Sequence, residues 1–428
     1  MPHSLTIHDP TRSTTGQLGG LIAAGCTVIV ASLLAISPLA LYMFGWQYFD
    51  TGGSPVEKFH PATLAAIGVL LAMATTYGNP LTGLIEIAKR HEALLPYLAA
   101  NGFMIVYAAI ILKLPVTIFI EVFVGAAIIF VVFANQNERL AHRLALLIHA
   151  LLMANAVLGF YEVMTSTRMT PLVINGEDLL DEPRATALLG HPLANAMLMG
   201  TYVVMMAQGG ARDLPRWLRP VVFLIALASL IPFGGRAATA ATMVCLAYLG
   251  SQRLIAILRG ATFDTRSVIA GIVAVPLAAV ALLAALDLGA FDTLTNRLFD
   301  DEGSAGTRIE MFALFRYLSA YDLVFGPDPN MLMTWVRLHG LEYGIESFIV
   351  AFVLNYGLLA TALFFPTFGL FLYHMKQRLR PGAGLVIACM LAVALTSISL
   401  SAKSPALSIF VMTLTILMRK TKRSGDLR

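Results

Sequence analysis

Apolar runs close to 20 residues long recur along almost the whole chain and leave few options for its fold. A helix of about 20 apolar residues crosses the roughly 30 Å hydrocarbon core of a bilayer. The chain has 428 residues, of which 58% are hydrophobic and 13% are charged, whereas soluble domains are about 45–50% apolar. The sequence therefore predicts an all-α, polytopic transmembrane helical bundle of about 12 helices.

We expect a single integral membrane domain over residues 1–428. The helices are predicted at 20–44, 62–79, 94–112, 115–135, 143–163, 191–209, 218–233, 236–251, 267–287, 346–373, 382–400 and 404–418. Residues 288–345 form the longest and most polar segment between two spans, and we expect a large periplasmic loop with short helices there. The polar start and the length of the first apolar run argue against a cleavable signal peptide.

The basic residues predict the orientation. With the N-terminus in the cytoplasm and alternating loops, 19 of the 29 Lys and Arg residues fall on the cytoplasmic side. By the positive-inside rule, both termini are expected to be cytoplasmic in a multi-pass membrane protein. The net charge of +4 is dispersed over the loops, so no nucleic-acid partner is expected. Cys26, Cys245 and Cys389 all fall in apolar runs, and we interpret them as packing residues rather than a disulfide or metal site.

Arg236 stands at the seam between two predicted spans, in 232-PFGGRAA-238. An arginine at the membrane edge either snorkels to lipid phosphate, pairs with an acid or binds a ligand. The small residues around it favour a ligand, because they let a bulky group approach the backbone. Glu121 lies inside a predicted span, and its sequence context assigns it no role.

Three further stretches carry polar residues that face the predicted outer side. In 304-SAGTRIEMFALFR-316, Ser304 or Thr307 is expected to cap an amphipathic helix, with Arg308 in its first turn and Arg316 farther along. In 335-WVRLHGLEYGIES-347, His339 and Glu346 are candidate general bases, with helix capping and an ordinary loop histidine as alternatives. His191 and Asn195 open another span four residues apart and share one face, where they could orient a sugar or only cap and cross-link helices.

The Gly-Gly-Arg turn, the long loop opening with Gly306-Thr307-Arg308, and the polar start of the helix after it resemble the O-antigen ligase and O-antigen polymerase superfamily. The resemblance covers most of the chain and is strongest between His191 and Leu359. It implies a metal-independent glycosyltransferase without cofactors. The donor would be a polyprenyl-diphosphate-linked oligosaccharide, with Arg236 and Arg308 on the diphosphate. A chain-length regulator and a flippase are further partners implied by the resemblance.

One feature departs from the family pattern. Family ligases commonly place a histidine at the start of the helix after the large loop, where this chain reads Ile345-Glu346-Ser347. Glu346 is the favoured base and His339 the alternative. The departure favours a polymerase of exopolysaccharide or O-antigen repeat units over an O-antigen ligase that acts on a lipid A-core acceptor. A polysaccharide transporter or flippase is the third hypothesis, and Glu121 inside a span is the feature in its favour.

Overall fold

The chain is helical almost throughout in the computed structural model, which describes residues 10–49, 52–171, 173–174, 177–178, 184–260, 304–341 and 344–420. The strands within these ranges are the two-residue β1 (Val173–Ile174) and β2 (Glu177–Asp178), which pair antiparallel. The predicted all-α class is therefore confirmed, apart from this short hairpin.

In chain order, the helices are α1 (Pro10–Ala35), α2 (Pro38–Met43), η1 (Pro55–Lys58), α3 (Pro61–Thr75), α4 (Pro80–Arg90), η2 (Glu92–Leu94), α5 (Leu95–Val106), η3 (Tyr107–Leu112), η4 (Phe119–Val124), α6 (Gly125–Ala134), α7 (Glu138–Thr165), α8 (Pro192–Met205), η5 (Met206–Gly210), α9 (Leu218–Ala228), α10 (Leu230–Phe233), α11 (Arg236–Leu258), α14 (Ser304–Ala313), η6 (Leu314–Tyr317), α15 (Ala320–Phe325), α16 (Pro329–Leu338), α17 (Phe348–Arg378), α18 (Ala383–Ala394) and α19 (Ala406–Leu417).

Five helices in the described part are long and apolar enough to cross a membrane, and the count is six if α3 and α4, bent by 102°, form one span. Four further apolar helical stretches are shorter, at Phe119–Ala134, Leu218–Phe233, Ala383–Ala394 and Ala406–Leu417. These helices are compatible with a multi-pass membrane protein. The predicted span 267–287 lies outside the described residues, so the number of twelve spans stays a prediction.

Two predicted spans break earlier in the structure, and hydroxyl side chains make local hydrogen bonds where they break. The span predicted at 20–44 breaks after Ala35, where Ser37 accepts a hydrogen bond from Ala40 N and caps α2, with Pro38 at its first position. The span predicted at 382–400 ends as α18 at Ala394. In the turns that follow, Thr396 Oγ1 donates to the Val393 carbonyl, so side chains take over helical backbone acceptors.

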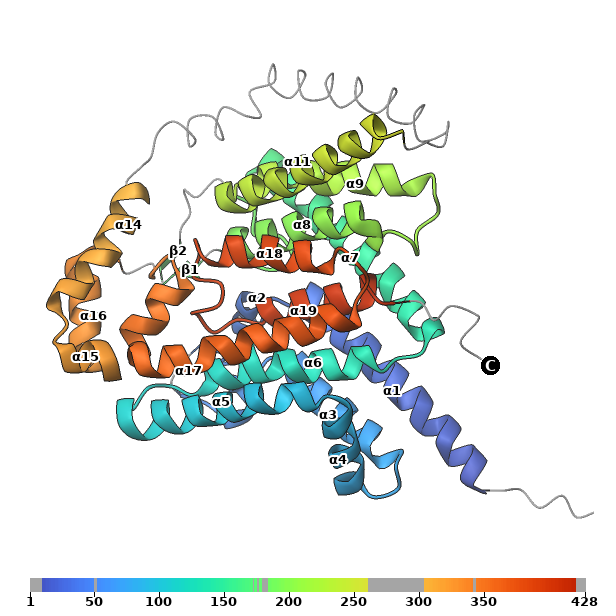
Figure 1. The fold of residues 1–428 in the computed structure, drawn as a ribbon, viewed down its shortest axis with the longest axis horizontal. Helices are drawn as coiled ribbons and strands as arrows, with labels where there is room; N and C mark the ends of the chain where they lie inside the picture. The colour runs from blue at the N-terminus through green and yellow to red at the C-terminus, as the bar shows by residue number, and fades with distance from the viewer. Residues whose placement is uncertain are drawn as a thin grey trace, which may run out of the picture.

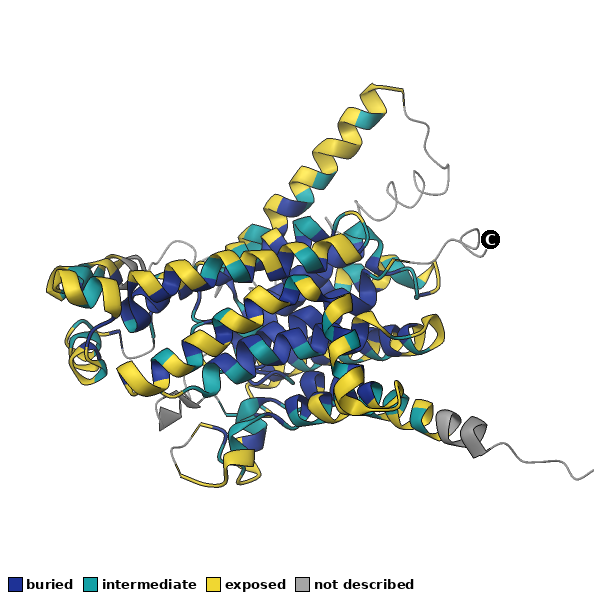
Figure 2. Ribbon diagram, turned by 60° about the horizontal axis from the view of Figure 1, so that its bottom comes forward, coloured by how far each residue is buried: buried dark blue, intermediate teal, exposed yellow. Residues whose placement is uncertain are grey.

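The helices pack into one elongated bundle whose buried residues gather along its middle (Figures 1 and 2). In the packing, α1 lies against α3 and α7, α19 against α6, α17 against α5, and α11 against α8 and α18. Aromatic rings from α5, η4 and α17 pack together, some of them stacked and some edge to face. They are Tyr97, Phe119, Phe123, Phe352, Phe364, Phe368 and Phe371. Cys26, Cys245 and Cys389 are buried and unbridged, as predicted.

The two ends of the bundle differ in their elements (Figure 1). One end carries α14, α15, α16 and the hairpin, together with the starts of α8, α11 and α17, and we call it the α14–α16 end. The opposite end carries Asp213, the start of α7 and the far ends of α11, α17 and α19, and we call it the Asp213 end. The predicted short helices in the segment 288–345 are present as α14–α16.

The helices α14–α16 have a small hydrophobic core of their own on the start of α17. It is made by Met311, Leu314, Leu332, Leu341, Ile345, Ala351 and Leu354. These helices meet α17 at a backbone contact on Gly357, where φ is +79 and the helical geometry of α17 is interrupted. A Cβ at Gly357 would lie 2.5 Å from Gly326 N and from Val324 O. Only glycine therefore allows α15 to approach α17 this closely.

Charged side chains hold the helix termini together at the Asp213 end. Arg419 donates from its Nη1 and Nη2 to the two Asp213 oxygens at 3.0 and 2.7 Å, a bidentate pair. His142 Nδ1 lies 2.7 Å from Asp213 Oδ1, and the Asp213 side chain is 5% exposed. Burial acts to raise the pKa of Asp213, but the hydrogen bonds from Arg419 and His142 outweigh it and hold that pKa below its ordinary value. The carboxylate thereby ties α7 and the end of α19 to the turn after η5.

We expect Asp213→Ala to lower the free energy of unfolding by about 3 kcal/mol, because it leaves Arg419 and Arg212 without their carboxylate. Thermal unfolding in detergent would measure this. Glu138→Ala is the matched control, because Glu138 meets the same Arg419 at 3.4 Å but is 52% exposed, and its loss should cost less than about 1 kcal/mol. Since the Asp213 pKa is lowered on folding, its stabilisation is present above the ordinary value of 3.8 and disappears as the pH falls below it. Equal losses in the two variants would contradict this assignment.

Candidate functional site

The residues predicted to bind substrate lie at the α14–α16 end wherever the structure describes them. Arg236 is the first residue of α11, His191 is the N-cap of α8, and Glu346 directly precedes Ser347, the N-cap of α17. Arg308 lies on α14, whose side-chain surroundings at this position are outside the described residues. Arg316 is exposed on η6, as expected for a solvated face.

The Gly-Gly turn fixes Arg236 at the start of α11. Gly234 adopts φ +59, which ends α10, and a Cβ at Gly235 would overlap Ala196 Cβ of α8. The same close packing recurs one turn deeper, where Gly200 faces Thr242. The side chain of Arg236 is half-buried. Small residues thus let α8 and α11 pack closely, and this packing fixes the backbone of Arg236 at the start of α11.

A second arginine, which the sequence analysis missed, lies against the same turn. A Cβ at Gly234 would lie 2.9 Å from Arg184 Cγ and Cδ, and Ala185 N donates to Pro232 O at 2.9 Å. Arg184 comes from the segment before α8, 52 positions from Arg236 in sequence. The turn therefore carries two guanidinium side chains rather than one.

Acidic and amide side chains of α7 hold this segment in place. Glu162, which is 3% exposed, accepts hydrogen bonds from Met169 N, Thr186 N and Ala187 N at 2.8–2.9 Å. Asn155 Oδ1 accepts one from Leu188 N at 3.0 Å. Three backbone donors on one carboxylate make Glu162 a fixed anchor for the chain between α7 and α8. This role of Glu162 depends on hydrogen bonds to residues up to 25 positions away in the sequence.

The side chain of Asn195 donates hydrogen bonds to backbone carbonyls in the structure. Its Nδ2 donates to Thr186 O at 2.6 Å and to His191 O at 3.1 Å, and the side chain is fully buried. This arrangement favours the capping and cross-linking interpretation of the His191–Asn195 pair. His191 itself is half-buried at the mouth of α8.

His339 belongs to a group of polar and aromatic side chains on α14–α16. Its Nδ1 lies 2.6 Å from Glu310 Oε2, and its Nε2 lies 3.2 Å from the Tyr317 hydroxyl. The Tyr317 ring stacks on Trp335 at 5.6 Å. The carboxylate on Nδ1 orients the imidazole, as the acidic partner of a histidine general base does. Neither Glu310 nor Tyr317 was singled out from the sequence.

Glu346 lies where α14–α16 join the bundle. Gly344, two residues before it, has φ +106, and a Cβ there would lie 3.0 Å from Ile398 in the turns between α18 and α19. The segment that carries Glu346 therefore lies against the turns after α18, and α18 itself packs against α11. The Glu346 side chain is half-buried.

Glu121 is the centre of a buried polar cluster at this same end. It is 0% exposed and accepts hydrogen bonds from Thr63 Oγ1 at 3.1 Å and His60 N at 3.4 Å. Lys403 approaches it from the turns after α18, donates from its Nζ to Tyr48 O at 2.6 Å and lies 4.2 Å from the Tyr48 ring centroid. Burial lowers the pKa of Lys403 to about 8, and the charge of Glu121 opposes that change. The cluster therefore brings the charges of an acid and a base that lie 282 positions apart close enough to influence each other.

No protein-family model, curated protein or solved structure matches this chain. Any functional assignment therefore depends on the side chains gathered at the α14–α16 end. In the described part of the chain, no three His, Cys, Asp or Glu side chains gather as ligands for a metal ion.

Proposed function

We propose that this chain is a membrane glycosyltransferase that polymerises polyprenyl-diphosphate-linked oligosaccharide repeat units at the periplasmic face of the inner membrane. The observation that carries the proposal is the Gly234–Gly235 turn, which is followed by Arg236 and contacted by the side chain of Arg184, at the end of the bundle that also carries α14–α16. Guanidinium groups match phosphate oxygens in charge and geometry. A lipid diphosphate lies at the level of the membrane surface, which is where short turns between spans lie.

The reaction needs a leaving-group site and a base. The acceptor hydroxyl oxygen attacks the anomeric carbon of the donor, and the bond from that carbon to the diphosphate oxygen breaks. The diphosphate leaves with the bonding electron pair, and Arg236, Arg308 and Arg184 stabilise its developing charge. The hydroxyl proton passes to a general base. Fixed guanidinium charges can perform the electrostatic part without a metal.

The geometry shifts our assignment of the base from Glu346 to His339. His339 has the carboxylate of Glu310 on Nδ1, so its Nε2, beside the Tyr317 hydroxyl, is the nitrogen available to a substrate. It lies at the end of α16 over the junction of α14–α16 with α17, where an acceptor sugar can enter from outside the bilayer. Glu346 stays the alternative, because it is half-buried at the helix start closest to that junction.

The two other hypotheses differ in measurable ways. A ligase would use the same donor chemistry and a lipid A-core acceptor, so a deletion strain would accumulate long lipid-linked polymer instead of single units. A transporter is favoured by the buried Glu121 and the half-buried Lys403 in its cluster, because ionisable groups inside membrane proteins often lie on ion or substrate paths. The transporter hypothesis requires that Glu121→Gln abolish function while Arg236→Ala does not.

The test is an assay with the purified full-length protein and polyprenyl-diphosphate-linked repeat units, with EDTA present. We expect a ladder of longer lipid-linked products whose formation EDTA does not affect. A ladder that EDTA abolishes would contradict the metal-independent mechanism. No ladder from folded protein that binds the donor would overturn the polymerase, and lipid A-core would then be added to test the ligase.

A further inference from the structure

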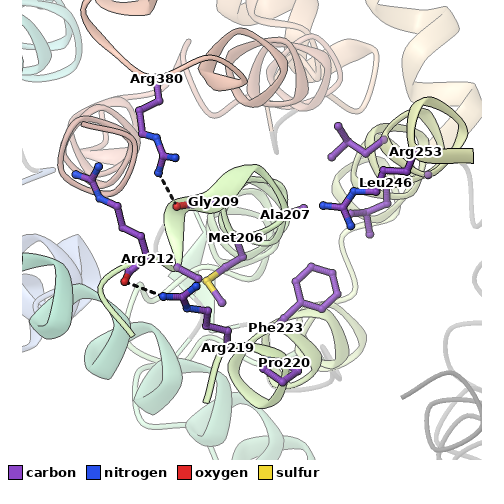
Figure 3. Close-up of a pocket in the computed structure, with 13 residues that line it drawn as sticks. Met206, Ala207, Gly209, Arg212, Arg219, Pro220, Phe223, Leu246, Arg253 and Arg380 are labelled. Atoms are coloured by element: carbon purple, nitrogen blue, oxygen red, sulfur yellow. Dashed lines mark hydrogen bonds between the residues drawn. The ribbon is translucent and has the colours of Figure 1, made fainter. Parts of the chain in front are cut away.

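A cavity of about 630 Å³ lies at the Asp213 end, far from the candidate site (Figure 3). It is bounded by η5 (Met206–Gly210), by α9, by the far half of α11 and by Arg380 before α18. This half of α11 stands away from the bundle and is largely exposed (Figure 2). The cavity therefore opens between helices at the level where spans meet the membrane surface.

The lining combines apolar walls with four arginine residues. Met206, Phe223 and Leu246 contribute apolar surface from three different helices. The basic residues are Arg212, Arg219, Arg253 and Arg380. Figure 3 shows Arg253 reaching from α11 on one side and Arg219 on the other, whereas the guanidinium of Arg212 points away from the space between them. Such a lining suits a molecule with an anionic head and an apolar tail.

The positive charge in this region exceeds the acidic charge that contacts it. Asp213 is occupied by Arg419 and His142, and Arg212 Nε lies 3.8 Å from it. The two terminal nitrogens of Arg212 are buried and have no hydrogen-bond partner within the described residues. Burial, followed by the charge of Arg419, lowers the pKa of Arg212. A bound anion would offset this excess of positive charge.

The neighbouring arginines are held in place for such a ligand. Arg219 donates to Leu214 O and Arg212 O at 3.1 and 3.0 Å, and Arg380 donates to Gly209 O at 3.1 Å. These bonds fix their side chains while leaving other guanidinium N–H groups for a ligand. Trp217, which is 73% exposed beside the cavity segment, is typical of a residue at the membrane–water interface.

We infer that this cavity binds the phosphate headgroup of an anionic phospholipid, whose acyl chains lie along the apolar faces of α9 and α11. Guanidinium groups bind phosphate oxygens bidentately, and basic pockets between transmembrane helices are established headgroup sites. The cavity volume exceeds what a free phosphate needs, and its apolar walls favour an amphiphile. The site does not involve Arg236 or α14–α16, so it is independent of the proposed transferase activity.

Native mass spectrometry of the full-length protein in detergent, titrated with phosphatidylglycerol or phosphatidylcholine, tests the inference. We expect phosphatidylglycerol to bind more tightly, and Arg253→Gln to weaken that binding about fivefold. Arg253→Lys should keep most of the affinity because it keeps the charge. Arg259→Gln is the matched control, since Arg259 ends the same helix, is exposed and does not line the cavity. Its affinity should stay within about twofold of the wild type.

Three results would overturn the inference. The first is an equal effect of Arg253→Gln and Arg259→Gln, which would indicate attraction by general surface charge. The second is equal binding of the two lipids. The third is displacement of phosphatidylglycerol by inorganic phosphate at the same concentration, which would identify a free anion as the ligand. Arg253 is exposed, so its variants are expected to keep the wild-type melting temperature without added lipid, and this is measured first.

Discussion

Replacing Arg236 by alanine is expected to slow elongation of the lipid-linked product by about 100-fold or more, the usual effect of removing one fixed donor to a developing charge. The protein should still fold, because Arg236 is half-buried at a helix terminus and the neighbouring glycine contacts are unchanged. Arg236→Lys keeps the charge but loses the planar fork, and we expect a smaller loss of about tenfold. Initial rates of ladder formation with the purified variants would measure both effects.

The matched control is Arg259→Ala at the opposite end of the same helix, which should leave the elongation rate unchanged. Arg184→Ala tests the second guanidinium on the turn, and we expect an effect between those of Arg236→Lys and Arg236→Ala. A normal product ladder from well-folded Arg236→Ala would rule out the diphosphate site at this turn. It would also direct attention to the cluster that holds Glu121 and Lys403.

The second large effect is expected at His339. His339→Asn should lower the elongation rate by about 100- to 10,000-fold, the range for loss of a general base. Glu310→Gln should lower it less, by about tenfold, because Glu310 orients the imidazole without touching the substrate. Donor binding should be unchanged in both variants, since the diphosphate is held elsewhere. Single-turnover rates together with donor affinity would separate these effects.

Glu346→Gln is the competing variant, because glutamine keeps the shape of glutamate and removes the proton acceptor. If it abolishes elongation while His339→Asn keeps at least about a third of the rate, the base is Glu346. Tyr317→Phe is the local control for His339. It keeps the ring that stacks on Trp335 and removes only the hydroxyl near Nε2.

The length of the apolar runs predicted the helical class and the approximate positions of most described helices. Run length alone could not predict where the helices break, as they do after Ala35 and after Ala394. Run length also failed to predict α4, in which apolar and polar residues are interspersed and which lies at 102° to α3. Hydropathy indicates which segments are buried in lipid or protein. It does not indicate where a helix ends, because helix ends depend on individual hydrogen bonds.

The candidate site was predictable only where its signal is local. The Gly-Gly-Arg turn is contiguous in sequence, and so is the polar stretch before α17. The contacts of Arg184 with Gly234 and of His339 with Glu310 join residues 50 and 29 positions apart. No spacing rule within a helix or strand predicts such pairs, because packing of separate helices brings them together. The arginine-lined cavity depends in the same way on three helices and a turn.

The junction between α14–α16 and α17 has a consequence for how such a protein can evolve. The three helices carry their own small core and meet the rest of the chain at a junction built on Gly326 and Gly357. Residues on their outward faces, such as Arg316 and Tyr321, are exposed and do not contribute to core packing. Under the proposed activity, acceptor preference can diversify by substitutions on those faces. The turn that receives the donor, fixed by Gly235 against Ala196, would be inherited nearly unchanged.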